Sequence, residues 1–178
     1  MAGFSYKKSL AGNQQPVLVP FVIKNSVQLT VGDPVNVNTD GFADLAANNE
    51  RIAGVVMGFT TKNGGQTTLT TSGTVANTTV TAASDNQTVA KVKALVCVDP
   101  FAQYELEADA TLGTTTGSNL SGIYFDITGT TGAVKADENV LVGGGSNANG
   151  SQLYSIGPSP ENPTTHILCS IRENEMFA

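Results

Sequence analysis

The stretch that decides the fold is residues 89–98, Val-Ala-Lys-Val-Lys-Ala-Leu-Val-Cys-Val. From Val92 onward, valine and alanine hold every second position, with lysine, leucine and cysteine between them. Side chains alternate between the two faces of a β-strand, so this period of two predicts a half-buried strand. The strand should end at Asp99-Pro100, because proline has no N–H to donate to a neighbouring strand.

Similar short apolar segments recur on both sides of this strand, separated by turns rich in glycine, proline and asparagine. Gly32-Asp33-Pro34, between two alternating segments, is typical of a hairpin turn. Short strands at such spacing, with no helical repeat, predict an all-β fold with little helix, either a small β-barrel or a sandwich. The expected strands are residues 16–23, 29–37, 52–59, 89–98, 104–108, 122–128, 140–142, 153–156 and 166–171.

The composition supports the same fold class. Of the 178 residues, 40% are hydrophobic, enough for a core, but only 13% are charged, against about 25% in an average globular domain. The polar surface must therefore consist largely of threonine, serine, asparagine and glycine. Threonine and valine favour pleated strands because branching at Cβ stiffens χ1.

The apolar members of the expected strands predict the core. Pro20 lies inside the continuous apolar run of residues 16–23, and it predicts that this strand is bent or lies at a sheet edge. The expected core residues are Val17, Val19, Phe21, Ile23, Val55, Val92, Val96, Val98, Ile123 and Ile171.

Residues 1–14 show neither a strand period nor a helix period. We expect them to form an extended N-terminal arm that contacts a neighbouring subunit or surface. In this arm Phe4 and Tyr6 would be apolar anchors, and Lys7 and Lys8 would meet acidic groups. Residues 15–178 are then one β domain, with two lobes divided near the Thr-rich residues 67–88 as the alternative.

Charge and hydropathy exclude two classes of partner. The net charge is −6 and the nine basic residues form no cluster, which argues against nucleic-acid binding. No apolar run approaches the 18 residues of a membrane-spanning helix. Because the start of the sequence has no apolar signal region, we expect synthesis in a cytoplasm. Cys97 and Cys169 should then be reduced and buried, with a single disulfide as the alternative.

The sequence offers no combination of residues typical of catalysis. His166 is the only histidine, and no serine lies in the glycine-flanked motif of an activated nucleophile. One histidine and two distant cysteines do not match the spacing of a metal site. We therefore expect no enzymatic activity, no catalytic residue, no metal and no cofactor.

Three segments together resemble the capsid decoration (cement) proteins of tailed phages. They are Leu29-Thr-Val-Gly-Asp-Pro-Val, Arg51-Ile-Ala-Gly-Val-Val and Val96-Cys-Val-Asp-Pro-Phe-Ala-Gln-Tyr-Glu-Leu. The resemblance covers about a quarter of the chain, and it extends to the low charge and the abundance of glycine, alanine and threonine.

The resemblance implies a structural virion protein made in the cytoplasm of a bacterial host. Such a protein binds the outer surface of the assembled major capsid protein, often as a homotrimer, and stabilises the capsid. Two alternatives stay open. One is a component of a phage tail, baseplate or head fibre, and the other is a carbohydrate-binding β module. The absence of tryptophan argues against the second, because sugar rings stack on aromatic faces.

Overall fold

The computed structural model describes residues 3–12, 15–48, 50–61, 79–109, 111–112, 121–122, 124–137 and 152–172. Its regular structure is almost entirely β, so the expected all-β fold is confirmed. The strands are β1 Ser5–Ser9, β2 Leu18–Val22, β3 Gln28–Thr30, β4 Pro34–Val37, β5 Ala43–Leu45, β6 Gly54–Thr61, β7 Thr79–Thr81, β8 Val92–Cys97, β9 Ala102–Glu107, β10 Tyr124–Thr128, β11 Lys135–Asp137, β12 Leu153–Pro158 and β13 His166–Ile171. The helix α1 spans Asn86–Val89.

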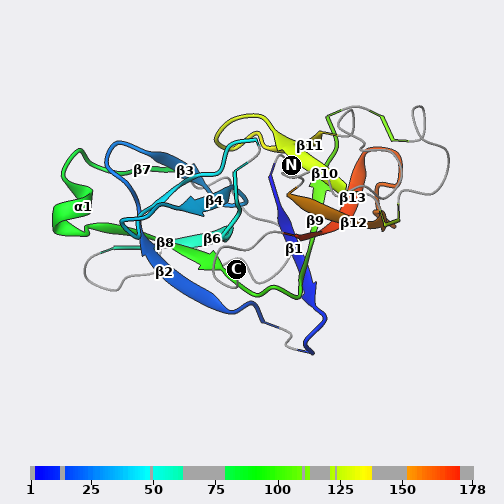
Figure 1. The fold of residues 1–178 in the computed structure, drawn as a ribbon, viewed down its shortest axis with the longest axis horizontal. Helices are drawn as coiled ribbons and strands as arrows, with labels where there is room; N and C mark the ends of the chain where they lie inside the picture. Colours follow the sequence, from blue (N-terminus) through cyan, green and yellow to red (C-terminus); the bar gives the residue numbers. More distant parts are fainter. Residues whose placement is uncertain are drawn as a thin grey trace.

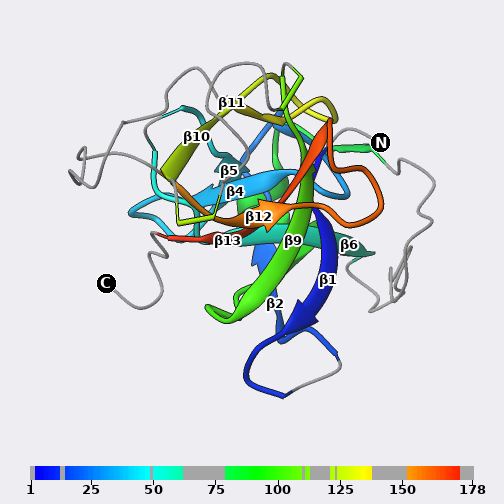
Figure 2. The same cartoon turned by 90° about the vertical axis from the view of Figure 1, so that its right-hand side faces the viewer.

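The strands form two main sheets and a small third one. One sheet has six strands in the order β1-β9-β13-β12-β10-β11, another has five in the order β2-β8-β6-β4-β5, and β3 pairs with β7. Figure 1 shows the six-stranded sheet on the right and the other two on the left, and Figure 2 shows the five-stranded sheet behind the six-stranded one. Of the two predicted architectures, the described residues fit the sandwich and form no closed barrel.

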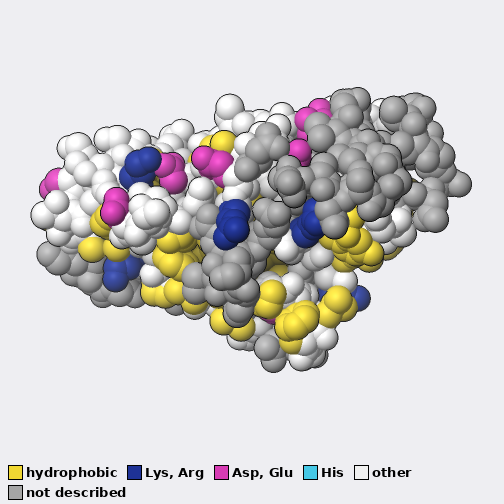
Figure 3. Space-filling model, in the orientation of Figure 1, with side chains coloured by type: hydrophobic (Ala, Val, Ile, Leu, Met, Phe, Trp, Pro, Cys, Tyr) yellow, Lys and Arg dark blue, Asp and Glu magenta, His cyan; other side chains and the backbone are white. Residues whose placement is uncertain are grey.

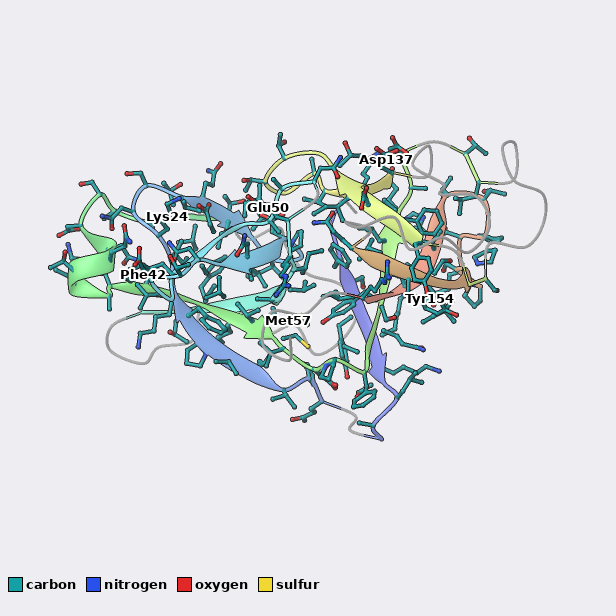
Figure 4. The ribbon with its side chains drawn as sticks, viewed as in Figure 1. Lys24, Phe42, Glu50, Met57, Asp137 and Tyr154 are labelled. Carbon is teal, nitrogen blue, oxygen red and sulfur yellow. The ribbon has the colours of Figure 1, made fainter. Side chains whose placement is uncertain are left out.

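Two apolar clusters hold the sheets together. The first lies between the two main sheets, where Met57 of β6 belongs to the same cluster as Phe125 of β10; Figure 4 shows Met57 in this central position. The second cluster covers the other face of the five-stranded sheet, where Val56 and Val96 pack with Leu29 of β3. Strand β8 is therefore buried on both faces from Ala94 onward, rather than half-buried as its alternating pattern predicts.

Most of the expected core residues are in these clusters. Ile23, Val55, Val96 and Val98 are buried. Val19, Phe21, Val92 and Ile171 are partly buried and pack against a cluster. Val17 was wrongly assigned to the core. It precedes the first residue of β2 and is 48% exposed. Ile123 and the expected strand 140–142 lie outside the described residues.

The expected N-terminal arm is an edge strand of the six-stranded sheet, which corrects the sequence-based prediction. Residues Ser5–Ser9 form β1 and pair with β9. The register of this pairing shifts between Tyr6 and Lys8. A bulge inserts a residue and interrupts the alternation of side chains between faces, so the segment has no period of two and does not look like a strand in the sequence.

The chain just before β1 also packs tightly against the body. The Phe4 N–H donates to the Gly32 carbonyl oxygen at 2.8 Å, and the Gly3 N–H donates to Val134 at 3.0 Å. Gly32 has a φ of 94°, and a Cβ on it would lie 3.0 Å from the Phe4 carbonyl oxygen. Only glycine adopts this conformation readily and leaves room for so close an approach.

The chain passes from one main sheet to the other between Cys97 and Ala102, at the turn from β8 to β9. Of the alternative lobe boundary near 67–88, residues 67–78 lie outside the described residues. Strand β7 and helix α1, which follow, both belong to the body around the five-stranded sheet (Figure 1). The division into lobes at that point stays a prediction.

Candidate functional site

The two predicted aromatic anchors are part of the protein's own interior. Phe4 is only 4% exposed, and its ring lies edge-on to Tyr104 with 5.5 Å between the ring centroids. Tyr6 is partly buried against the same cluster. Phe4 therefore has almost no exposed surface for a neighbouring subunit, and the contact expected for Phe4 and Tyr6 stays a prediction.

Lys7 meets acidic groups, as predicted, but they belong to its own chain. Its Nζ lies 2.6 Å from Glu105 Oε2 and 3.6 Å from Glu161 Oε2. Lys8 is exposed and forms no ion pair with another described residue. Of the four predicted contact residues, Lys8 is thus the one whose charge is available to a partner.

Lys7 and Glu105 line a polar pocket of about 430 Å³. Its other lining residues are Gly3, Ser5, Glu161, Asn162 and His166. Strands β1, β9 and β13 each contribute to it, together with the loop between β12 and β13. We call this cavity the polar pocket. It joins three separate parts of the chain, so sequence spacing alone does not reveal it.

An ion pair between the exposed Lys7 and the nearly buried Glu105 lines the polar pocket. Burial of the Glu105 carboxyl raises its pKa, but hydrogen bonds from Lys7 and Ser159 and the positive charge of Lys7 outweigh burial, so the pKa lies below its ordinary value. The hydrogen bond to Glu105 in turn raises the pKa of Lys7. Both groups are consequently charged at neutral pH, and the pair ties β1 to β9.

His166 lines the same pocket and contacts a neighbouring hydroxyl. Its Nδ1 lies 2.9 Å from the hydroxyl oxygen of the adjacent Thr165. Within the part of the chain that the structure describes, no group of three or more His, Cys, Asp or Glu side chains is placed to hold a metal ion. The polar side chains that line the pocket can hydrogen-bond a small polar molecule.

We predict that Lys7→Met lowers stability at neutral pH by about 1–3 kcal/mol, because it leaves Glu105 charged and nearly buried without its main partner. In the wild type, the lowered pKa of Glu105 contributes stability that is present above pH 4.5 and is lost as the pH falls through the folded-state pKa. In the variant, burial without Lys7 should raise the folded-state pKa of Glu105 above its ordinary value of 4.5. The variant should therefore lose stability as the pH rises through that folded-state pKa. Urea unfolding at a series of pH values measures both effects.

Lys8→Met is the matched control for this prediction. Lys8 is on the same strand, is exposed and has no ion pair among the described residues, so its replacement should change stability by no more than about 0.5 kcal/mol. Equal stability of the Lys7 and Lys8 variants across the pH series would contradict the proposed importance of the Lys7–Glu105 pair.

An apolar surface, which was not predicted from the sequence, lies at the other end of β1. Leu10 is 63% exposed and Phe101 is 55% exposed, the two highest values among the large hydrophobic residues that the structure describes. The Leu10 N–H donates to the Phe101 carbonyl oxygen at 3.0 Å, which holds the two residues side by side. We call Leu10, Phe101 and the exposed Pro100 the apolar tip. The sequence feature that could have indicated this surface is Phe101, which directly follows the Asp99-Pro100 end of the strand. A phenylalanine in a turn between strands has no place on the buried face of a sheet.

The two cysteines lie in the cluster between the main sheets. Both thiols are free and buried, which agrees with the expectation of reduced, buried cysteines. Burial raises the pKa of Cys97, and it raises that of Cys169 far above the ordinary thiol value. Neither thiol is suited to act as a nucleophile, because the reactive species is the thiolate.

Comparisons with known proteins assign no family or function to this chain. None of the helices among the described residues has the length and apolar character needed to cross a bilayer. A scan against protein-family models, a search of curated proteins and a search of solved structures found no match to this chain.

Proposed function

We propose that this chain is a non-enzymatic structural protein that binds the outer surface of an assembled major capsid protein lattice of a tailed phage and stabilises it. The resemblance of three sequence segments to capsid decoration proteins points to the capsid. The observation that carries the proposal is the apolar tip, a pair of exposed hydrophobic side chains at the end of a two-sheet body.

The apolar tip has the character of an anchor for a protein surface. Leu10 and Phe101 leave more than half of their area in water, and burying a side chain of this size contributes about 1.5–3 kcal/mol. A few such side chains supply most of the binding energy in many protein interfaces. Two anchors side by side therefore support attachment to a partner through this end of the molecule.

The charged residues of the body also support docking on another protein. Four lysines already pair with carboxylates of the same chain: Lys7 with Glu105 and Glu161, Lys24 with Asp44, Lys91 with Asp85, and Lys135 with Glu107. A partner that covers these paired side chains removes fewer isolated charges from water, and isolated charges are the costly ones to bury.

We predict that Leu10→Ala combined with Phe101→Ala weakens binding to capsids by about 2–5 kcal/mol, while the stability of the free protein changes little. The measurement is the number of copies bound per capsid when particles lacking the protein are mixed with limiting amounts of wild type or variant. Tyr154→Ala is the control, since Tyr154 is 39% exposed on β12 in the right-hand part of the molecule (Figure 4).

Equal occupancy by wild type and the double variant would show that the apolar tip is not the anchor. Binding of the wild type to purified tails instead of heads would replace the capsid by the tail as the proposed partner. Failure to bind either structure would contradict the proposal as a whole.

A further inference from the structure

Asp99 lies in the turn where the chain passes from β8 to β9, directly before the two turn residues of the apolar tip. Its carboxylate Oδ1 accepts a hydrogen bond from the Phe101 N–H at 2.9 Å, and its backbone carbonyl oxygen accepts one from the Ala102 N–H at 3.1 Å. Aspartate often closes a turn in this way, by binding the backbone N–H two residues further on. The carboxylate therefore fixes the backbone from which the Phe101 side chain projects.

The same turn also sets the position of Leu10, which directly follows β1. The N–H of Phe101 is bound by Asp99, and the carbonyl oxygen of Phe101 accepts the Leu10 N–H at 3.0 Å. Figure 3 shows hydrophobic side chains at the lower margin of the molecule, where Figure 1 has the end of β1. Both exposed side chains of the apolar tip thus depend on one short series of hydrogen bonds that begins at the Asp99 carboxylate.

Asp99 is not arranged as an aspartate that chiefly stabilises the fold. It is 8% exposed, and its Oδ2 is buried and accepts no hydrogen bond from the residues that the structure describes. Burying a polar atom without a partner costs free energy, which offsets part of what the Oδ1 bond contributes. Asp33, in contrast, binds a backbone N–H through each of its carboxylate oxygens. A local arrangement that costs stability is more typical of a functional position than of a purely structural one.

We infer that Asp99 is the positioning residue of the apolar tip and holds Phe101 and Leu10 in the arrangement that binds the partner. This inference rests on the proposed function, in which the apolar tip is the anchor. A turn that is already ordered in the free protein loses less conformational entropy on binding. Without the Asp99 carboxylate, the turn has to be ordered during binding, and the affinity falls.

The first test is a titration of capsids that lack the protein. Asp99→Ala should bind them about three- to tenfold more weakly than the wild type. Its unfolding midpoint in urea should change little, because the lost hydrogen bond is offset by removal of the unpartnered Oδ2. In a Phe101→Ala background, Asp99→Ala should have a much smaller effect on binding, since the main side chain that it positions is gone. An aspartate with a merely structural role would weaken binding equally in both backgrounds.

Hydrogen exchange in the free protein tests the contact without any capsid. The amides of Phe101 and Leu10 should exchange about tenfold faster in Asp99→Ala than in the wild type, because the turn that protects them opens more often. Asp99→Asn keeps an oxygen acceptor at the same place. It should therefore restore both the slow exchange and the binding to capsids.

Asn38→Ala is the matched control for the loss of a turn acceptor. Asn38 Oδ1 accepts the N–H groups of Asp40 and Phe42 in the turn between β4 and β5. Its replacement should leave the exchange of the Phe101 amide and the binding to capsids unchanged.

Two kinds of failure are distinguishable. Unchanged exchange of the Phe101 amide in Asp99→Ala would overturn the positioning role of Asp99 even if the wild type binds capsids. An Asp99→Asn variant that behaves like Asp99→Ala, or an equal loss of binding with and without the Phe101 side chain, would do the same. A wild type that binds no capsid would overturn the proposed function and, with it, the role of Asp99 in binding.

Discussion

Replacing Val96 by aspartate is expected to unfold the protein. Val96 has no exposed area and lies in the middle of β8, between its register partners Val19 of β2 and Val56 of β6. A carboxylate there would lose its hydration without gaining a partner, which costs several kcal/mol. The whole stability of a domain is about 5–15 kcal/mol, so the variant should be largely unfolded or melt at a much lower temperature.

Val96→Ala separates the charge from the loss of packing. It removes two methyl groups from the same place and should cost about 1–3 kcal/mol, leaving a folded protein with a lower unfolding midpoint. Circular dichroism during heating measures both variants. A Val96→Asp protein that melts at the wild-type temperature would contradict the burial of β8 on both faces.

Replacing Asp33 by alanine is expected to have the next largest effect. Asp33 has no exposed area, and its two carboxylate oxygens accept separate backbone N–H groups. Oδ2 accepts from Thr30 at 2.7 Å, and Oδ1 accepts from Gly132 at 2.8 Å. The first bond closes the turn before β4, and the second joins this turn to the one between β10 and β11.

Asp33→Ala leaves both backbone donors without this acceptor. Each lost partner of a buried polar group costs about 1–3 kcal/mol, so we predict a loss of about 2–5 kcal/mol in the free energy of unfolding by urea. Asp33→Asn keeps one oxygen acceptor and should lose less. Equal stability of the wild type and Asp33→Ala would show that the carboxylate does not hold these turns together.

The pH dependence provides a second measurement for Asp33. Burial raises its pKa, and the hydrogen bonds from Gly132 and Thr30 offset only part of this increase. A raised folded-state pKa means that the contribution of Asp33 is complete below the ordinary value of 3.8 and declines as pH rises through the folded-state value. The stability difference between wild type and Asp33→Ala should therefore narrow as the pH rises through this range.

Several local features were predictable because they depend only on neighbouring residues. The alternation after Val92 identified β8, and Asp99-Pro100 marked its end. Pro20 was expected at an edge or a bend, and β2 is an edge strand. Proline has no backbone N–H to donate to a neighbouring strand, so it restricts a strand to a sheet edge or a bend whatever residues surround it.

One other local interpretation was wrong because the partners of a strand lie far away in the sequence. The segments on either side of Gly32-Asp33-Pro34 do not form the expected hairpin. Instead, β3 pairs with β7, whereas β4 pairs with β5 and β6. The turn itself is present, but Asp33 stabilises it together with Gly132, about a hundred residues away. Turn chemistry predicts a change of direction and does not specify which strands pair.

The polar pocket and the place of β1 depended entirely on the tertiary structure. Lys7, Glu105, Glu161 and His166 have no common motif, and they meet because β1 pairs with β9 and β9 pairs with β13. The bulge in β1 removed the one periodic signal by which residues 5–9 would have been recognised as a strand.

By itself, the sequence determined that this chain is built of short β-strands joined by turns, since residue period, branched side chains and turn residues act over a few neighbours. Only the tertiary structure decided which faces those strands bury. The second face of β8 is covered by a sheet whose strands come from both ends of the chain. That covering depends on long-range packing, in which apolar surface is buried wherever the whole chain brings it together.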